Sequence, residues 1–551
     1  MLPDSEHTND ALGAALAVLD EPLPGPVDYV SYDVRRALLL VGPSKPVLEI
    51  ARALRHRFDV VAVIDGPRPQ ARLLGIDVVA ATVVTLNGHL GRFSAEANDS
   101  DGQPIDLRRH SSNDDGYFDL VMDLSPKPIC DQSIPPLGYL RPTDSSQYES
   151  ALEALLALSG EVRKPRYIDF VPWRCVNRRQ QVPGCERCLD TCPAGAITIG
   201  EQSVTVDAHL CRGCGACASV CPTGALTFTD PSPSDVVERL ERALEAFRSA
   251  GGTDPWIVFH TENGAAITRW AAIDGITLLP FAVHSVASLG LEVWLAAIAL
   301  GAAGAVLLAP ENLPAMALGA LSRNVDLAGN ILESLGQPRG RVQLLNSSAV
   351  GLEADVAAPA GGSNFGPPWS YPLTDPNPRS RLLALFERLS ARSRDGCERP
   401  ATTLPASAPF GGVALDAKRC TMCLACTNLC PTGALRTGGD GVELNFVEAD
   451  CIQCGLCEHG CPEHAVKRQP RFDYAALRDG KMITLNRARM ANCTQCKRPY
   501  MSAALLASAL EHLSGAGAAN GQAREMLLIC PQCRADNAMK SQFASMPRPR
   551  E

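Results

Sequence analysis

The sequence lacks the basic excess that nucleic-acid-binding proteins normally carry. Asp and Glu total 60 against 51 Lys and Arg, which gives a formal net charge of −9, and aromatic residues make up only 5% of the 551 residues. A protein that neutralises phosphates would show the opposite balance, with basic residues gathered on one surface. We therefore expect no nucleic-acid partner.

A secretory signal and a membrane span are also missing. The first ten residues, MLPDSEHTND, are polar and acidic where a signal peptide would be basic. One uncharged apolar run, residues 293–309, is slightly short for a bilayer and contains Gly301. This pattern favours a buried helix to Leu300, a stop at Gly301 and a buried strand after it. We expect a cytoplasmic protein without a transmembrane segment.

Motifs of organic-cofactor chemistry are absent as well. The sequence has neither a Walker lysine pattern nor the glycine fingerprint of a dinucleotide site after a strand. We assign no nucleophile–base pair, no carboxylate pair and no catalytic residue. The chain therefore resembles an electron-transfer component more than a stand-alone enzyme.

Cysteine is what the sequence has in quantity. There are 22 cysteines, and most fall in a repeated motif that begins at residues 211, 420 and 451, with a shortened copy at 185. In a chain without a secretory signal, clustered cysteines indicate metal ligands rather than disulfides. The complete copies read C-x2-C-x2-C-x3-C-P, the bacterial ferredoxin run for [4Fe–4S] clusters.

The spacing predicts which cysteines share a cluster. Three closely spaced thiolates bind one cluster and the fourth cysteine binds its neighbour, so two motifs interlock. Structural zinc is disfavoured here, because zinc sites use isolated C-x2-C pairs. The predicted sets of the second module are Cys420, Cys423, Cys426 and Cys461 for one cluster, and Cys430, Cys451, Cys454 and Cys457 for the other.

The first module departs from this pattern. Its first motif lacks one cysteine, and Cys175 stands ten residues before Cys185, across the segment VNRRQQVPG. We interpret this segment as an insertion after the first ligand. If Cys175 is not a ligand, a three-iron cluster would result. The predicted sets are Cys175, Cys185, Cys188 and Cys221 for one cluster, and Cys192, Cys211, Cys214 and Cys217 for the other.

The C-terminal tail carries two further C-x2-C pairs, separated by an apolar helix predicted within residues 501–513. Two such pairs can close a tetrahedral zinc site, with mononuclear iron or an unmetallated dithiol as alternatives. We expect Cys130 and Cys397 to be ordinary thiols, and His459 and His464 to lie at the surface or behind the ligands. The four predicted zinc ligands are Cys493, Cys496, Cys530 and Cys533.

The predicted fold class is multidomain α/β: two dicluster-ferredoxin modules joined to open, mostly parallel α/β domains and a C-terminal ribbon. Strands are expected at 37–42, 58–65, 80–86 and 118–124 in the first α/β domain. The predicted order is a flexible arm (1–30), an α/β domain (31–165), module 1 (166–230), an α/β domain (231–350), a linker (351–412), module 2 (413–470) and the tail (471–551).

Three resemblances to known families add to these predictions. The cysteine blocks resemble dicluster bacterial ferredoxins. Residues 118–142, with the cysteine block that follows, are similar to the large iron–sulfur proteins encoded beside proteobacterial formate dehydrogenases, which implies such a partner and supports Cys175 as a ligand. Residues 231–350 resemble the small iron–sulfur subunit associated with heterodisulfide reductases, but residues 259–263, FHTEN, lack its cluster cysteines.

Two functions of different class fit these observations. The first is electron transfer to or from a partner oxidoreductase, with a basic stretch beside module 1 as a docking patch or a solvated loop. The second is a non-redox accessory or maturation scaffold for a molybdenum or tungsten enzyme. The basic stretch comprises Arg163, Lys164, Arg166, Arg174, Arg178 and Arg179.

Overall fold

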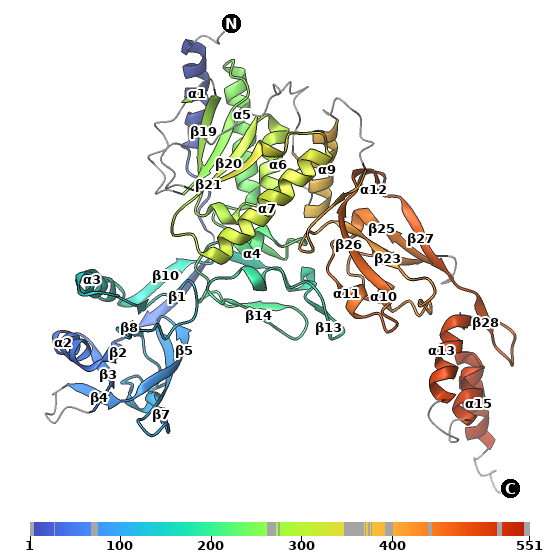
Figure 1. The fold of residues 1–551 in the computed structure, drawn as a ribbon, viewed down its shortest axis with the longest axis horizontal. Coiled ribbons are helices and arrows are strands. Elements are labelled where there is room, and N and C mark those ends of the chain that lie inside the picture. Colours follow the sequence, from blue (N-terminus) through green and yellow to red (C-terminus); the bar gives the residue numbers. More distant parts are fainter. Residues whose placement is uncertain are drawn as a thin grey trace, which may run out of the picture.

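The computed structural model combines helices with parallel and antiparallel sheets around two cysteine-rich modules (Figure 1). Module 1 lies at the centre, where two α/β domains and module 2 meet, and the tail extends beyond module 2. The described residues are 5–26, 28–67, 75–261, 272–273, 276–346, 369, 371–372, 375, 377–391, 400–438, 443–514 and 521–544.

The first α/β domain is built on a five-stranded parallel sheet in the order β4-β3-β2-β8-β9. The helices α2 (Ser44–Leu54) and α3 (Tyr148–Ala157) share one buried apolar cluster with β2 and β3. The predicted strands at 37–42, 58–65 and 118–124 are confirmed. The sheet strands are β2 (Ala37–Pro43), β3 (Asp59–Asp65), β4 (Ile76–Ala80), β8 (Leu120–Asp123) and β9 (Tyr139–Leu140).

The predicted strand at 80–86 does not join that sheet. It forms β5 (Thr82–His89), which pairs antiparallel with β6 (Arg92–Asn98), and β6 pairs with β7 (Pro104–Asp106). Only Ala81 separates β4 from β5, and a parallel neighbour needs a crossover of a dozen residues or more. The small antiparallel sheet instead packs on the other face of the parallel sheet, with Phe93 and Ala95 beside Leu39.

The second α/β domain has a sheet in the order β18-β19-β17-β20-β21, parallel except for β18. Its helices are α5 (Pro233–Ser249), α6 (Leu291–Leu300) and α7 (Ala315–Ser334). The strands are β17 (Trp256–His260), β18 (Ala272–Ile273), β19 (Ile276–Ala282), β20 (Gly304–Ala309) and β21 (Val342–Asn346).

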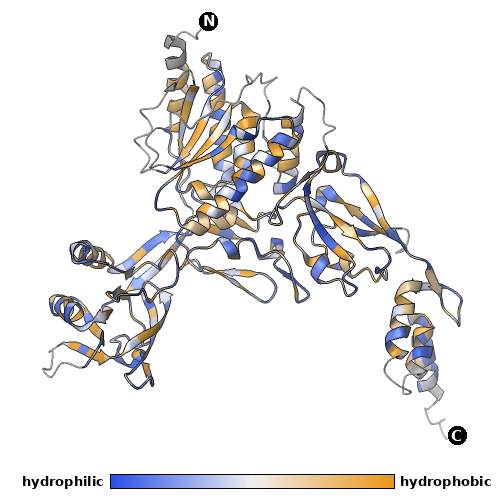
Figure 2. Cartoon of the chain, in the orientation of Figure 1, coloured by the Kyte–Doolittle hydropathy of each residue, from blue (hydrophilic) through white to orange (hydrophobic). Residues whose placement is uncertain are grey.

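The apolar run at 293–309 folds as predicted into a buried helix and a buried strand. Every residue of α6 except Glu292 is buried, and Gly301 ends it with a φ of 129°. All residues of β20 are buried too, and Figure 2 shows the apolar character of this domain's interior. Within the described part of the chain, no helix is long and apolar enough to cross a bilayer.

Two segments predicted to be irregular contain docked helices, so these predictions are wrong. Helix α1 (Ser5–Leu19), in the predicted flexible arm, packs on α5 with Ala11 and Ala15 fully buried. The main-chain carbonyls of Leu19, Glu21 and Pro22 accept hydrogen bonds from Arg239. Helix α9 (Pro378–Ser390), in the predicted linker, buries Leu385, Phe386 and Leu389 in the same core. Residues 351–368 and 392–399 of the linker, Cys397 among them, lie outside the described residues.

The two modules are small two- and three-stranded antiparallel sheets with one-turn helices. Module 1 pairs β11 (Ile168–Phe170) with β16 (Leu226–Phe228), β12 (Arg178–Arg179) with β13 (Val182–Pro183) and β14 (Ile197–Ile199) with β15 (Val204–Val206), and contains α4 (Ala216–Ser219). Module 2 contains β22 (Thr402–Thr403), β23 (Gly411–Leu415), β26 (Val466–Phe472), β24 (Leu435–Gly438), β25 (Glu443–Val447), α10 (Ala425–Leu429), α11 (Leu456–His459) and α12 (Tyr474–Asp479).

The first part of the predicted tail belongs to module 2, and the remainder lies beyond it. Strand β27 (Met482–Arg487) pairs with β25. Beyond it lie the hairpin β28 (Met490–Asn492) and β29 (Pro499–Ser502), then helices α13 (Ala503–Ser514), α14 (Gly521–Leu527) and α15 (Pro531–Ala544). At the start of the fold, β1 (Tyr29–Val34) pairs antiparallel with β10 (Gly160–Pro165), which joins the first α/β domain to module 1.

Candidate iron–sulfur sites

The first cysteine site joins residues from both halves of module 1. A small cavity is lined by Cys175, Cys185, Cys188 and Cys221, and we call it site 1. The main-chain N–H of Cys185 donates to the carbonyl of Val176 at 3.0 Å. The displaced Cys175 thus lies with the three cysteines that the sequence grouped with it.

The nine-residue insertion between Cys175 and Cys185 is a hairpin whose base is closed. Strands β12 and β13 pair across it, and Gln180 and Gln181 form its tip with φ values of 51° and 65°. Gly184 donates to the carbonyl of Asn177 at 2.6 Å. Such positive φ values at two successive residues are typical of tight hairpin turns. Because the base of the hairpin is closed, the chain leaves and re-enters the module at nearly the same place, and Cys185 lies close to Cys175.

The same hairpin forms part of the contact between the two modules. Val176 and Val182 pack in one apolar cluster with Leu429 and Leu456 of module 2, and Cys185 and Cys454 belong to it. His459 Nδ1 lies 2.9 Å from the carbonyl oxygen of Pro183. The insertion thus lies between site 1 and a cysteine loop of module 2.

Site 2 is the second cavity of module 1, lined by Cys192, Cys211, Cys214 and Cys217. Its wall includes Ile134, whose N–H donates to the carbonyl of Pro193 at 3.1 Å. Ile134 belongs to the loop after β8. The buried carboxylate of Asp123 holds this loop, because it accepts hydrogen bonds from the N–H groups of Ser125 and Ile129 and from the hydroxyl of Tyr139. The segment that resembled the formate-dehydrogenase-linked proteins therefore covers site 2.

Module 2 repeats the arrangement. Site 3 is a cavity lined by Cys420, Cys423, Cys426 and Cys461. Burial raises the pKa of Cys457 well above the ordinary value, and Cys454, Cys451 and Cys430 lie near enough to add to this shift. We call this group site 4. The structure thus brings together all four of the predicted ligand sets.

The donor sets fit iron–sulfur clusters on chemical grounds. Burial raises the pKa of Cys188 and Cys426 to about 12, and of Cys214 to about 11, with nearby cysteine sulfurs adding to it. A thiolate at such a position needs a bound cation to stabilise it. Main-chain N–H groups of Ala196, Ala465 and Leu435 point at the sulfurs of the last cysteine in three motifs, at 3.3, 3.3 and 3.4 Å. Such hydrogen bonds favour a sulfur that carries negative charge.

The packing of the cysteines gives the four sites the order 2, 1, 4, 3. Cys188 of site 1 shares an apolar cluster with Cys217 of site 2, Cys185 of site 1 with Cys454 of site 4, and Cys457 of site 4 with Cys426 of site 3. Cys188 of site 1 lies close enough to contribute to the raised pKa of Cys217 in site 2. Burial raises the pKa of Cys454 in site 4 to about 11, with a smaller contribution from Cys185 of site 1. Cys426 of site 3 likewise adds to the raised pKa of Cys457 in site 4. Each adjacent pair of sites therefore has sulfurs in mutual electrostatic range.

Comparison with known proteins agrees with this geometry. Two regions match families described as 4Fe–4S dicluster domain, residues 181–225 and residues 419–466. An uncharacterized ferredoxin of Methanocaldococcus jannaschii is 42% identical over 48 residues, which is 9% of this chain and 76% of that protein. The chain belongs to the ferredoxin-type iron–sulfur proteins. It carries 4Fe–4S domains and binds metal, and its ferredoxin domains imply a redox partner.

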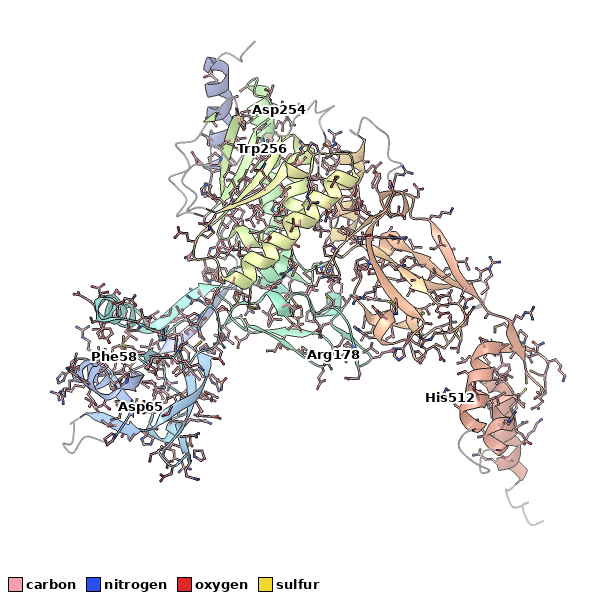
Figure 3. The ribbon with its side chains drawn as sticks, viewed as in Figure 1. Phe58, Asp65, Arg178, Asp254, Trp256 and His512 are labelled. Carbon is pink, nitrogen blue, oxygen red and sulfur yellow. The ribbon has the colours of Figure 1, made fainter. Side chains whose placement is uncertain are left out.

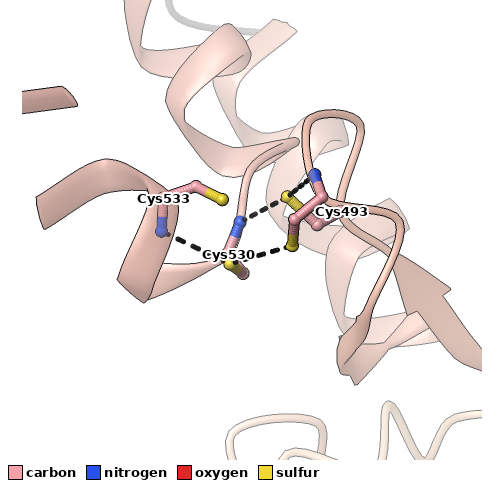
Figure 4. Close-up of side chains that lie close together, drawn as sticks. Cys493, Cys530 and Cys533 are labelled. Atoms are coloured by element: carbon pink, nitrogen blue, oxygen red, sulfur yellow. Dashed lines mark hydrogen bonds between the residues drawn. The ribbon is translucent and has the colours of Figure 1, made fainter. Parts of the chain in front are cut away.

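This ferredoxin-type protein has a fifth cysteine group in its tail. The sulfurs of Cys493, Cys496, Cys530 and Cys533 all lie within 4.8 Å of one another (Figure 4). Burial acts to raise the pKa of Cys493, but N–H groups from Cys496, Cys530 and Gln495 lower it to about 6. Four close sulfurs with a stabilised thiolate are a donor set that fits one tetrahedral ion.

One residue of the predicted basic stretch takes another role. Lys164, included in the basic stretch, is buried, and its ammonium donates to the carbonyls of His209 and Cys211 at 2.7 and 2.6 Å. It cannot be part of a docking patch. Cys130 is buried and donates to Gln132. His464 occupies a left-handed turn with a φ of 48°.

Two residues that the sequence did not indicate contact the cysteine sulfurs directly. Arg187 donates to the sulfur of Cys185 at 3.3 Å, and the amide of Gln453 donates to that of Cys451 at 3.3 Å. Gln453 lies between the first two cysteines of its motif, where the repeats at 211 and 420 have Gly213 and Met422. Arg187 lies between the second and third ligands of the first motif, where the other copies have Ala216, Ala425 and Leu456. A polar residue between two cysteines, where the other copies have apolar ones or glycine, was the available signal.

Proposed function

We propose that this protein is an electron relay that holds four [4Fe–4S] clusters, one at each of sites 1 to 4, with the sixteen cysteines named above as ligands. The observation that carries the proposal is the serial order of the sites, with Cys185 and Cys454 joining the two modules. Isolated structural sites would not need to adjoin one another. When bound, each cluster supplies a reversible one-electron centre whose potential depends on burial and hydrogen bonds to sulfur.

The protein's own residues would tune and insulate the relay. Arg187 and Gln453 place polar hydrogens on ligand sulfurs at the junction of the modules, and the N–H groups of Ala196, Leu435 and Ala465 do so elsewhere. The apolar cluster of Val176, Leu429, Ile452 and Leu456 keeps water from the junction. Dry surroundings and N–H donors both adjust the potential of an adjacent cluster.

We further propose a partner oxidoreductase that docks beside site 1, with formate dehydrogenase as the candidate that the resemblance of residues 118–142 suggests. Trp173 is 79% exposed, and the guanidinium of Arg174 lies 5.0 Å from its ring. Arg178, labelled in Figure 3, and Arg179 follow on the insertion hairpin. An exposed tryptophan among arginines suits an acidic partner surface.

Metal content tests the number of clusters. Anaerobically prepared protein should contain about sixteen irons and sixteen acid-labile sulfides, four of each per cluster. Cys175→Ala should remove one cluster or leave a three-iron EPR signal on oxidation, whereas Cys130→Ala, at a buried thiol outside the sites, should change nothing. A reproducible content of about eight irons in reconstituted protein would contradict the proposal.

Turnover tests the relay against a scaffold role. Native purification under anaerobic conditions should recover a partner enzyme whose turnover reduces or oxidises the clusters, as followed by EPR. Trp173→Ala should slow this reaction while the iron content is unchanged. Transfer of whole clusters to an acceptor protein, with no electron exchange, would instead support a maturation scaffold.

A further inference from the structure

A cavity of about 460 Å³ opens between module 1 and the second α/β domain. Its walls come from α4, the start of α6, the middle of α7, the start of α9 and the loop at residues 405–409, which lie around one region of the molecule (Figure 1). This volume falls in the range of small-molecule sites. The relay of clusters does not use this space.

The cavity and site 1 share a wall. Cys221, Pro222 and Leu226 line both, with Arg187 at the same boundary. A molecule in the cavity would therefore lie on the other side of a cysteine of site 1.

Apolar side chains form much of the remaining surface. Val220, Leu291, Val293, Leu327 and Leu382 line the cavity together with several prolines. Leu291 and Leu327 are almost fully buried. Such walls suit a flat ring system rather than a small hydrated ion.

The charged groups of the cavity are unequal in number. Three arginines line it, Arg187, Arg323 and Arg381, against two carboxylates, Asp190 and Glu292. Glu292 is already paired with Arg381 at 2.6 Å and accepts a hydrogen bond from the hydroxyl of Tyr371. Among the described residues no carboxylate pairs with Arg323, whose side chain is exposed. The balance favours a ligand with negative charge.

Two further features supply donors without acceptors. The amide nitrogen of Asn324 is buried and has no hydrogen-bond partner among the described residues, although Asn324 lines the cavity. Helix α6 begins at the cavity with Gly290, no side chain caps it, and the carboxylate of its first turn, Glu292, is paired with Arg381. Buried donors are normally satisfied, and the start of a ten-residue helix attracts anions.

We propose that this cavity binds a phosphorylated aromatic ligand of mononucleotide size, with the phosphate held by Arg323, Asn324 and the start of α6, and the ring against the apolar wall beside Cys221. The position next to site 1 favours a redox-active ring, so FMN is the probe of choice. The binding step itself requires no cluster, so it can fail or succeed independently of the electron relay.

Quenching of flavin fluorescence on titration of the anaerobically purified protein tests the proposal. FMN should bind in a saturable manner with one site per chain. Riboflavin, which lacks the phosphate, should bind at least about tenfold more weakly, and AMP should bind more weakly than FMN by a similar factor, as measured by competition. Equal affinity for AMP and FMN would overturn the redox assignment, and no saturable binding of FMN would overturn the site.

Matched variants locate the binding. Arg323→Ala and Asn324→Leu should each weaken FMN binding about tenfold, the loss expected when a charged or buried hydrogen bond is removed. Arg52→Ala, at an exposed arginine of α2 in the other α/β domain, should leave the affinity unchanged. Iron content and circular dichroism should match the parent protein in all three. Unchanged affinity in both cavity variants would place the ligand elsewhere and overturn the proposal.

Discussion

Arg187 donates a hydrogen bond to the main-chain carbonyl of Gln453 at 3.2 Å. Arg187 lies between Cys185 and Cys188 of site 1, and Gln453 lies between Cys451 and Cys454 of site 4. The same guanidinium donates to the sulfur of Cys185 and to the carbonyls of two residues before β23. One side chain thus fixes the cysteine loops of two modules relative to each other, at the proposed junction of the relay.

Replacing this arginine should alter the junction without emptying it. Arg187→Ala removes an N–H donor from a ligand sulfur, and such donors stabilise the more negative, reduced state of a cluster. We expect one cluster potential to fall by about 60 mV, the one-electron equivalent of a single hydrogen bond of about 1.4 kcal/mol. An anaerobic redox titration followed by EPR measures the shift.

The control for this prediction is Arg179→Ala, which removes an exposed arginine from the insertion hairpin. It should leave all four potentials in place. If Arg187→Ala leaves every potential unchanged as well, the contact with the Cys185 sulfur has no electronic role.

Closure of the insertion hairpin depends on Gly184. A Cβ atom there would lie 2.4 Å from the carbonyl oxygen of Val176 and 3.1 Å from that of Asn177. Gly184→Ala should therefore open the base of the hairpin and separate Cys175 from Cys185, with loss of about one cluster in four. Iron analysis measures the loss, and Gly340→Ala, where a Cβ meets open space, is the matched control. Full iron content in Gly184→Ala would show that site 1 tolerates an open hairpin.

The residue three places after the last cysteine of each motif has a left-handed backbone. Three copies use glycine, Gly195, Gly224 and Gly433, and the fourth has His464 with a φ of 48°. A side chain in this conformation costs roughly 1–2 kcal/mol, partly offset by the extra chain entropy of glycine. His464→Gly should raise the thermal stability of module 2 by about 1 kcal/mol.

The reverse change provides the control. Gly433→Ala adds a Cβ in open space at a φ of 69°, so only backbone strain opposes it, and it should lower stability by a similar amount. Anaerobic calorimetry, read together with the visible absorbance of the clusters, measures both. A destabilised His464→Gly would mean that the imidazole makes contacts worth more than the strain.

Which cysteines lie together could be predicted because each motif holds three of them close together in the sequence, and the paired motifs exchange the fourth. Cys211, Cys214 and Cys217 stand within seven residues of chain, and the cysteine missing from the first motif indicated Cys175 as its replacement. The contacts of Arg187 could not be predicted in this way, because their partners lie 220 to 266 residues further along the chain.

The docked helices were missed for a different physical reason. Helix α1 buries small residues, Ala11 and Ala15, so its apolar stripe is weak in the sequence. Helix α9 stands between long stretches rich in proline and glycine, a composition typical of linkers. In both cases tertiary packing, which local propensity does not contain, decides the outcome.

The four cysteines of the tail form a possible structural metal site close to module 2. The hydroxyl of Ser502 donates to the carbonyl of Thr421, between two cysteines of site 3, at 2.7 Å, so the tail hairpin adjoins the end of the proposed relay. We expect the four tail cysteines to hold one zinc. The double variant Cys530→Ser, Cys533→Ser should lose about one zinc and loosen the C-terminal helices, because zinc binding contributes directly to the folding of small metal sites.

The EPR signals of sites 1 to 4 decide between a structural and a redox tail. Zinc has no redox chemistry, so the double variant should retain these signals and the iron content of the parent protein. The control Ser502→Ala removes the contact with Thr421 and the hydrogen bond that the hydroxyl accepts from Leu505, and it should retain both the zinc and the clusters. If the parent protein contains no zinc and the double variant loses iron instead, the tail is a further iron site. The contact between Ser502 and Thr421 would then continue the relay toward the C-terminus.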